Sequence, residues 1–142
     1  MATGVKFNQF SEDLGLGVHN LNTGTLNVYL SDTAPSASLD LIKTDLAEIA
    51  TGNGYTGPVD TQNSWAESGG TSTLTGTKVV ITATGAVGPF RYVPLYNDTP
   101  TSPVDPLICY WDYGSSISLA NGETFSIKFN NSDTTGTILT LA

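Results

Sequence analysis

The side chains that could do chemistry in this sequence are few and dispersed. Paired carboxylates support glycoside hydrolysis, in which one acts as an acid and the other as a base or nucleophile. The sequence offers three sets, Glu12/Asp13, Asp40/Asp45/Glu48 and Asp112/Glu123. The first two sets are spaced like helix-surface and first-turn charges, which need no catalytic role. Asp112 stands between Trp111 and Tyr113, and aromatic rings line sugar sites, but a hydrogen-bonded strand carboxylate is the simpler interpretation.

The sequence also lacks partners for nucleophilic or metal chemistry. His19 is the only histidine, so a histidine metal site has too few ligands, and its place beside Gly17 and Asn20 indicates a structural hydrogen bond. Cys109 is the only cysteine and lies in an apolar run, which predicts a buried packing residue. No nucleophile-elbow, phosphate-loop or EF-hand motif occurs, and a weak calcium site made of loop carbonyls stays open. We predict neither an enzyme nor a bound cofactor.

The charge balance argues against polyanionic partners. The chain of 142 residues has 13 acidic and 5 basic side chains, which gives a formal net charge of −8. Binding to nucleic acid needs a basic stripe, whereas these basic residues are scattered singly. No stretch approaches the roughly 18 apolar residues of a membrane span, and the first residues lack the apolar segment of a secretory signal. We therefore expect no nucleic-acid or membrane partner.

Two short helices are predicted near the N-terminus. Phe7, Phe10 and Leu14 are spaced along one face of an amphipathic helix over 5–14, which Gly15 and Gly17 would end. A second helix is predicted over 45–50, with Thr44 as its N-cap. We expect a single domain over 1–142, in which 1–22 form an N-terminal helical segment or arm and 23–142 form a β-sandwich.

The rest of the chain is typical of short strands. They are predicted over 25–31, 78–84, 90–96, 107–113 and 137–141, with one or two weak strands between 57 and 76. The first would be half buried, with Asn27 and Tyr29 on its polar face. Asn121-Gly122 predicts a hairpin between 115–119 and 123–129, and three prolines make 97–106 a loop. This pattern predicts an all-β fold, an antiparallel jelly-roll-like β-sandwich or barrel.

The strands over 90–96 and 107–113 concentrate aromatic side chains. Phe90, Tyr92 and Tyr96 would share one face, yet neither strand alternates cleanly between apolar and polar residues. We therefore expect both faces to be covered, by a second sheet or by another copy of the chain. Aromatic and arginine side chains are favoured at the centres of protein interfaces. The candidates for such an interface are Phe90, Arg91, Tyr92, Tyr96, Tyr110, Trp111 and Tyr113.

Six segments resemble, in order and wording, a group of small structural proteins of tailed phages. They are FNQFSEDLGLGVHNL, TLNVYLSDTAPSAS, DLAEIATGNGYTG, VGPFRYVPLYND, CYWDYG and LANGETFSIKFNNSDTTGTILTLA. The resemblance covers nearly the whole chain and is to head decoration, or cement, proteins. It implies a jelly-roll-like domain, made in the host cytoplasm, that forms a homotrimer on the outer surface of the expanded capsid. There it would bridge major capsid protein subunits and oppose the pressure of packaged DNA.

Under this hypothesis the aromatic candidates form the trimer interface, and Val5, Phe7, Phe10 and Leu14 contact the capsid. Removal of residues 1–14 would then abolish capsid binding and leave a folded protein. Two alternatives remain. One is a carbohydrate- or receptor-binding module on the virion surface, with a glycan held by Trp65, Tyr110 and Trp111. The other is a tail-tube or adaptor component.

Overall fold

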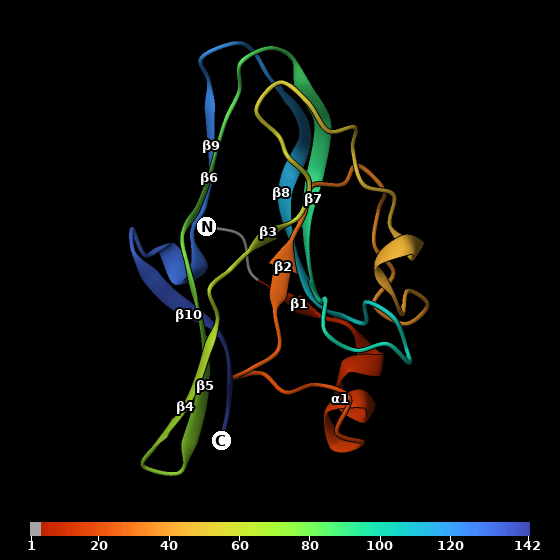
Figure 1. Cartoon of the computed structure of the whole chain (residues 1–142), viewed down its shortest axis with the longest axis vertical. Coiled ribbons are helices and arrows are strands. Elements are labelled where there is room, and N and C mark those ends of the chain that lie inside the picture. Colours follow the sequence, from red (N-terminus) through yellow and green to blue (C-terminus); the bar gives the residue numbers. More distant parts are fainter. Residues whose placement is uncertain (1–3) are drawn as a thin grey trace.

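The computed structural model, which describes residues 4–142, is an antiparallel β-sandwich (Figure 1). One layer is a five-stranded sheet in the order β1-β8-β7-β2-β3. Its strands are β1 (Val5–Lys6), β8 (Leu107–Leu119), β7 (Val87–Asn97), β2 (Leu26–Val28) and β3 (Val59–Asp60). The predicted all-β antiparallel fold is confirmed.

The second layer combines a three-stranded sheet, β10-β5-β4, with a two-stranded sheet, β6-β9. Its strands are β4 (Ser64–Ser68), β5 (Thr71–Thr77), β6 (Val79–Thr82), β9 (Thr124–Ile127) and β10 (Thr135–Leu141). Only Lys78 separates β5 from β6, and the short 3₁₀ helix η2 (Phe129–Asn131) connects β9 to β10. The two small sheets therefore continue one another along one side of the molecule (Figure 1).

The main hydrophobic core lies between the layers. Most strands point alternate side chains into it, because successive residues of a strand face opposite sides of the sheet, and the adjacent Ile108 and Cys109 both reach it at a shift in register. The five-stranded sheet contributes Leu26, Val28, Phe90, Val93, Leu95, Ile108 and Cys109, and the second layer contributes Leu74, Val79, Ile81 and Ile127. Burial raises the pKa of the Cys109 thiol to about 12, in keeping with its predicted packing role.

The alternation predicted for β7 is interrupted. The sequence places Phe90 and Tyr92 on one face, but the amides of Arg91 and Tyr92 both donate to the Ser31 carbonyl, so β7 has a β-bulge between Phe90 and Val93. As a result Phe90 lies fully buried in the main core with Val93 and Leu95, and Tyr92 faces the other side of the sheet. A β-bulge has this effect because its extra residue reverses the direction of the side chains that follow.

A smaller apolar cluster covers the outer face of the five-stranded sheet. Its members are Phe7, Tyr29, Leu46, Tyr96 and Leu107, with Tyr110 at its edge. The expectation that both faces of the β7–β8 pair are covered is confirmed where this cluster lies, and the chain itself supplies the cover. Farther along the same face, Arg91, Tyr92, Tyr110 and Asp112 are half-exposed. Tyr29 and Asn27 are buried, so the prediction of a half-buried first strand is wrong.

The N-terminal segment is integrated into the sandwich. Helix α1 spans Asn8–Gly15, whereas the preceding Val5–Lys6 pairs with β8 as a strand, so the helix predicted over 5–14 begins too early. Phe7 is 0% exposed and Phe10 is 3% exposed. The two rings pack into different clusters, one on each side of the five-stranded sheet. Residues 1–3 of the predicted arm lie outside the described residues.

The helix predicted over 45–50 is wrong. Only a 3₁₀ turn, η1 (Lys43–Asp45), forms, and Leu46 is already extended. The Asp45 carboxylate accepts hydrogen bonds from the Ile42 and Leu41 amides, so Asp45 caps this turn instead of Thr44. The following residues run beside the end of β2, because the amide of Ile49 donates to the carbonyl of Leu30.

The hairpin predicted around Asn121-Gly122 is also wrong in its pairing. The turn does connect β8 to β9, but β9 pairs with β6 in the second layer. The amide of Gly122 donates to the carbonyl of Ala83, which ties the turn to the end of β6. The chain therefore crosses between layers at this turn. By contrast, Asn53-Gly54 forms the predicted tight turn, with φ of 52° and 95°.

The burial of Phe7 leads to a stability prediction. Phe7→Ala is expected to lower the free energy of unfolding by about 3–5 kcal/mol, because it empties a fully enclosed site. Val5→Thr, at an exposed neighbouring position, should change it by no more than about 0.5 kcal/mol. Urea unfolding measures both. Equal urea midpoints for Phe7→Ala and the wild type would contradict this packing, and would revive the expectation that residues 1–14 are dispensable for folding.

Candidate functional site

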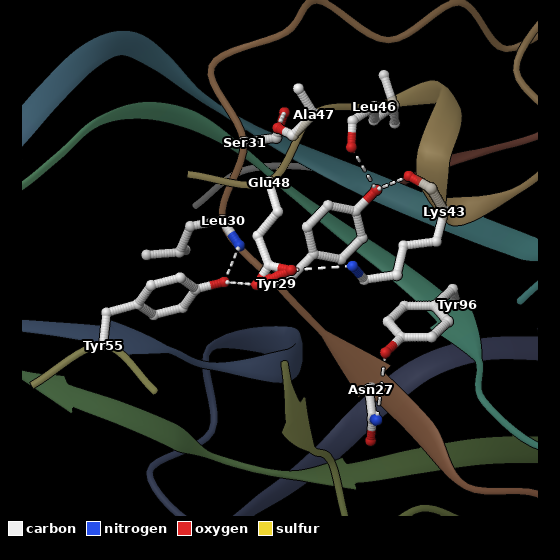
Figure 2. Close-up of polar contacts among 10 residues, drawn as sticks. All are labelled: Asn27, Tyr29, Leu30, Ser31, Lys43, Leu46, Ala47, Glu48, Tyr55 and Tyr96. Carbon is white, nitrogen blue, oxygen red and sulfur yellow. Dashed lines mark hydrogen bonds and ion pairs between the residues drawn. The ribbon is translucent and has the colours of Figure 1, made fainter. Parts of the chain in front are cut away.

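A connected group of polar contacts surrounds Tyr29, which is itself a member of the smaller apolar cluster (Figure 2). The Tyr29 hydroxyl lies 3.0 Å from the carbonyl oxygen of Lys43 and 3.3 Å from that of Leu46. Ser31 donates from its hydroxyl to the Ala47 carbonyl at 2.7 Å. These contacts attach residues 43–47 to the sheet through their backbone carbonyls.

Tyr55 and Glu48 continue this network. The Tyr55 hydroxyl accepts a hydrogen bond from the Leu30 amide at 3.1 Å and donates one to Glu48 at 2.9 Å. Glu48 also pairs with Lys43 at 2.9 Å, and the Lys43 ammonium lies 4.9 Å from the centre of the Tyr29 ring. Burial raises the pKa of both tyrosines, and the nearby Glu48 carboxylate raises it further. Both hydroxyls therefore stay protonated and act as structural donors.

Most of the carboxylates that could support hydrolysis are engaged in similar local bonds. Asp13 accepts from the Gln9 side-chain nitrogen at 3.0 Å, and Asp45 and Glu48 hold η1 and Tyr55 as described above. Asp112 forms a bidentate ion pair with Arg91, with nitrogen–oxygen distances of 2.8 and 3.0 Å. The hydrogen bonds from Arg91 and from the Gly114 amide lower the pKa of Asp112. The simpler interpretation of Asp112, as a hydrogen-bonded strand carboxylate, is confirmed.

His19 makes the predicted structural hydrogen bond. The Asn97 side-chain oxygen accepts from the Thr99 amide, which turns the Asn97 amide nitrogen toward His19 Nδ1 at 3.2 Å. Nδ1 therefore accepts, and the proton of the neutral ring sits on Nε2. Within residues 4–142, Nε2 has no hydrogen-bond partner. Burial lowers the pKa of His19, and the opposing effect of Asp13 is smaller.

The residues predicted to form one self-association interface are separated by the sheet. Phe90 and Tyr96 are 0% and 3% exposed, so they have no surface to offer a partner. Tyr92 pairs with Asp112 across the strands, which places Tyr92, Tyr110 and Arg91 on the outer face. Val93 pairs with Trp111, which places Trp111 and Tyr113 on the inner face. A single flat interface cannot contain all of them.

The predicted capsid-contact residues are divided in a similar way. Phe7 and Phe10 are core residues and cannot touch a partner, whereas Val5 is 39% exposed. Leu14 lines a groove of about 550 Å³ between α1 and β10, which we call the α1 groove. The other residues of this groove are Gly4, Lys6, Phe10, Ser11, Trp65, Cys109, Ile138, Leu139, Thr140 and Leu141.

The three residues proposed to hold a glycan do not form one platform. Trp65 lines the groove beside α1, and Tyr110 packs on Phe7 at the outer face, with ring centres 5.3 Å apart. Trp111 instead lines a second hollow of about 200 Å³ at the open side of the sandwich, between β8 and β9. We call this hollow the aromatic groove. Its other lining residues are Val93, Tyr113, Phe125, Ser126, Ile127, Lys128, Phe129 and Asn131.

Sequence reasoning missed the aromatic groove because it paired 115–119 with 123–129 in one hairpin. Pairing of those segments would have closed the space that β9 leaves open by joining β6. One signal was present in the sequence. Phe125, Ile127 and Phe129 alternate on one face, and this face meets Trp111 and Tyr113.

Comparisons with protein-family models, curated proteins and solved structures found no match to this chain. Among residues 4–142, no three His, Cys, Asp or Glu side chains are grouped as metal ligands. The same residues contain no helix with the length and hydropathy of a membrane span.

The role of the Tyr55 hydroxyl can be measured directly. Tyr55→Phe should lower the free energy of unfolding by about 1–3 kcal/mol, because it leaves the Leu30 amide and Glu48 without their partner. Tyr113→Phe is the matched control, because Tyr113 is exposed, and should change stability by no more than about 0.5 kcal/mol. If the two variants unfold at the same urea concentration, the network adds nothing to stability.

His19 leads to a prediction about acid sensitivity. The folded state keeps the ring neutral, whereas the unfolded chain takes up a proton near the ordinary pKa of 6.5. Stability contributed by this group is therefore present above that pKa and is lost as the pH falls through it. Between about pH 7.5 and 5.5, the wild type should lose more unfolding free energy than His19→Gln. Parallel pH profiles in urea unfolding would show that His19 is not the titrating group.

Proposed function

We propose that the chain is a non-enzymatic structural protein of a tailed phage, a decoration protein that binds the outer surface of the expanded head as a homotrimer. The resemblance of its segments to that group supports this proposal. The structural observation that carries it is a half-exposed patch on the outer face of the β7–β8 pair. We call it the outer patch, and its members are Arg91, Tyr92, Tyr110 and Asp112.

The outer patch has the composition and rigidity of an interface centre. The Arg91 guanidinium is fixed by Asp112 and lies 5.3 Å from the centre of the Tyr92 ring. Tyr92 in turn meets Tyr110 edge-on, with ring centres 6.4 Å apart, and Tyr110 rests on the buried Phe7. Side chains already held in place lose little entropy on binding, and tyrosine and arginine are enriched among residues that dominate binding energy.

The mechanism is stabilisation by mass action. A protein that binds the expanded lattice and not its precursor shifts the equilibrium toward the expanded form. Three linked copies add avidity to contacts that are individually weak. In the trimer we assign self-association to the outer patch. Contact with the major capsid protein falls to the exposed parts of the N-terminal segment, Val5 and the rim of the α1 groove at Lys6 and Leu14.

Light scattering behind a sizing column tests the trimer. The wild type should have the mass of three chains, and Tyr92→Ala should shift it toward the monomer, since truncating a central interface residue costs about 2 kcal/mol or more. Tyr113→Ala, on the opposite face of the sheet, is the control and should remain trimeric. A Tyr92→Ala protein that stays fully trimeric would remove the outer patch from the interface.

Cosedimentation with empty heads of the encoding phage tests the location. The wild type is expected to pellet with expanded heads and not with unexpanded precursors. A wild type that stays monomeric and pellets with neither would contradict the proposal, and stable six-membered rings would favour the tail-tube or adaptor alternative.

A further inference from the structure

The aromatic groove is a hollow whose lining shares no residue with the outer patch or with the α1 groove. It is lined by residues of β8 and β9, which belong to different layers of the sandwich. Its floor is the buried Val93, and its walls come from β8 on one side and from β9 and η2 on the other. The hollow measures about 200 Å³, below the roughly 300–1,000 Å³ of sites for drug-sized ligands. It therefore suits a ligand of about one ring.

Two pairs of aromatic side chains line this space. Trp111 packs on Phe129 with ring centres 5.4 Å apart, and Tyr113 meets Phe125 edge-on at 5.7 Å. Phe125 is backed by the buried Phe90 at 4.9 Å, so the rings are held in position from behind. Trp111 and Phe125 are half-buried, and Tyr113 is 55% exposed. Rigid, partly exposed rings of this kind stack on flat apolar ligand faces at little entropic cost.

The rim supplies hydrogen-bonding groups beside these rings. Ser126, Lys128 and Asn131 line the groove and are exposed. The Lys128 ammonium pairs with the exposed Asp133 carboxylate at 2.7 Å. Asn131 and Asn130 both have left-handed backbone angles, with φ of 57° and 49°. Such a conformation is uncommon outside glycine and tends to persist where the surrounding structure imposes it.

We propose that the aromatic groove binds one pyranose ring of a carbohydrate. A sugar ring has an apolar C–H face that stacks on aromatic rings and hydroxyl groups that both donate and accept hydrogen bonds. An aliphatic ligand would match the rings but bury the rim groups without partners, at a cost in free energy. A nucleotide would bring negative charge to a chain whose net charge is −8. A second copy of the chain would need a far larger contact than this hollow offers.

This inference goes beyond the proposed decoration role and does not depend on it. It also places the glycan at residues different from those expected from sequence, because only Trp111 of that set lines the groove. In a decorated head, such a site would give the virion surface an affinity for sugars without any change in the contacts that hold the trimer.

Saturation-transfer NMR on the purified chain tests the proposal with a panel of monosaccharides: glucose, galactose, mannose, rhamnose, N-acetylglucosamine and N-acetylgalactosamine. At least one should bind through its ring C–H protons. Tyr113→Ala should weaken that sugar about ten-fold or more, and Tyr113→Phe, which keeps the ring, should bind nearly as well as the wild type. Tyr113 is exposed, so both variants are expected to fold, and urea unfolding checks this.

Failure of this proposal is distinguishable from failure of the decoration role. No saturation transfer to any sugar in the panel would overturn the carbohydrate assignment, and binding unchanged in Tyr113→Ala would overturn its location. Tyr92→Ala should keep wild-type sugar affinity, because its side chain lies on the other face of the sheet. Tyr113→Ala should still pellet with expanded heads wherever the wild type does.

Discussion

Burial of the β7–β8 pair on both faces is the constraint on which the rest of the structure depends. A strand pair with apolar side chains on both faces needs other segments to pack on each face, and different parts of the chain do so. The second layer covers one face, and the N-terminal residues together with the segment around η1 cover the other. The segment around η1 packs on buried tyrosines. Because their hydroxyls are removed from water, they need hydrogen-bond partners within the protein. The carbonyls of Lys43 and Leu46 and the carboxylate of Glu48 are those partners.

The β7–β8 pair has two accessible aromatic surfaces, and no side chain belongs to both. Tyr92 and Tyr110 lie on the outer face beside the Arg91–Asp112 ion pair, while Trp111 and Tyr113 open onto the space between the layers. Adjacent residues of one strand can therefore serve different partners, because the pleat sends Tyr110 and Trp111 in opposite directions. Composition alone cannot separate these surfaces, since both are rich in the same residue types.

Periodicity in the sequence was enough to predict the all-β antiparallel fold, the strands at Lys78–Thr84 and near the C-terminus, the proline-rich loop and the Asn53-Gly54 turn. The failures share one cause, which is that tertiary contacts overrode local signals. Asn121-Gly122 favours a hairpin locally, but its flanking strands gain more by joining separate layers. The segment after Thr44 has helical propensity, yet it pairs with the end of β2. The bulge that sends Phe90 inward has no sequence signature, so the candidate interface could only be divided once the register was known.

The pairing of the second layer also bears on how the chain is made. Thr135 lies opposite Thr77 and Val79 lies opposite Ile127, so β5 and β6 acquire these partners only from the last part of the sequence. During translation, the apolar side chains of Leu74, Val79 and Ile81 therefore stay uncovered until residues 124–141 have left the ribosome. Such long-range pairing slows folding and exposes nascent chains to aggregation and to chaperones. The second layer therefore closes only after residues 124–141 have emerged, and the surfaces built on it form no earlier.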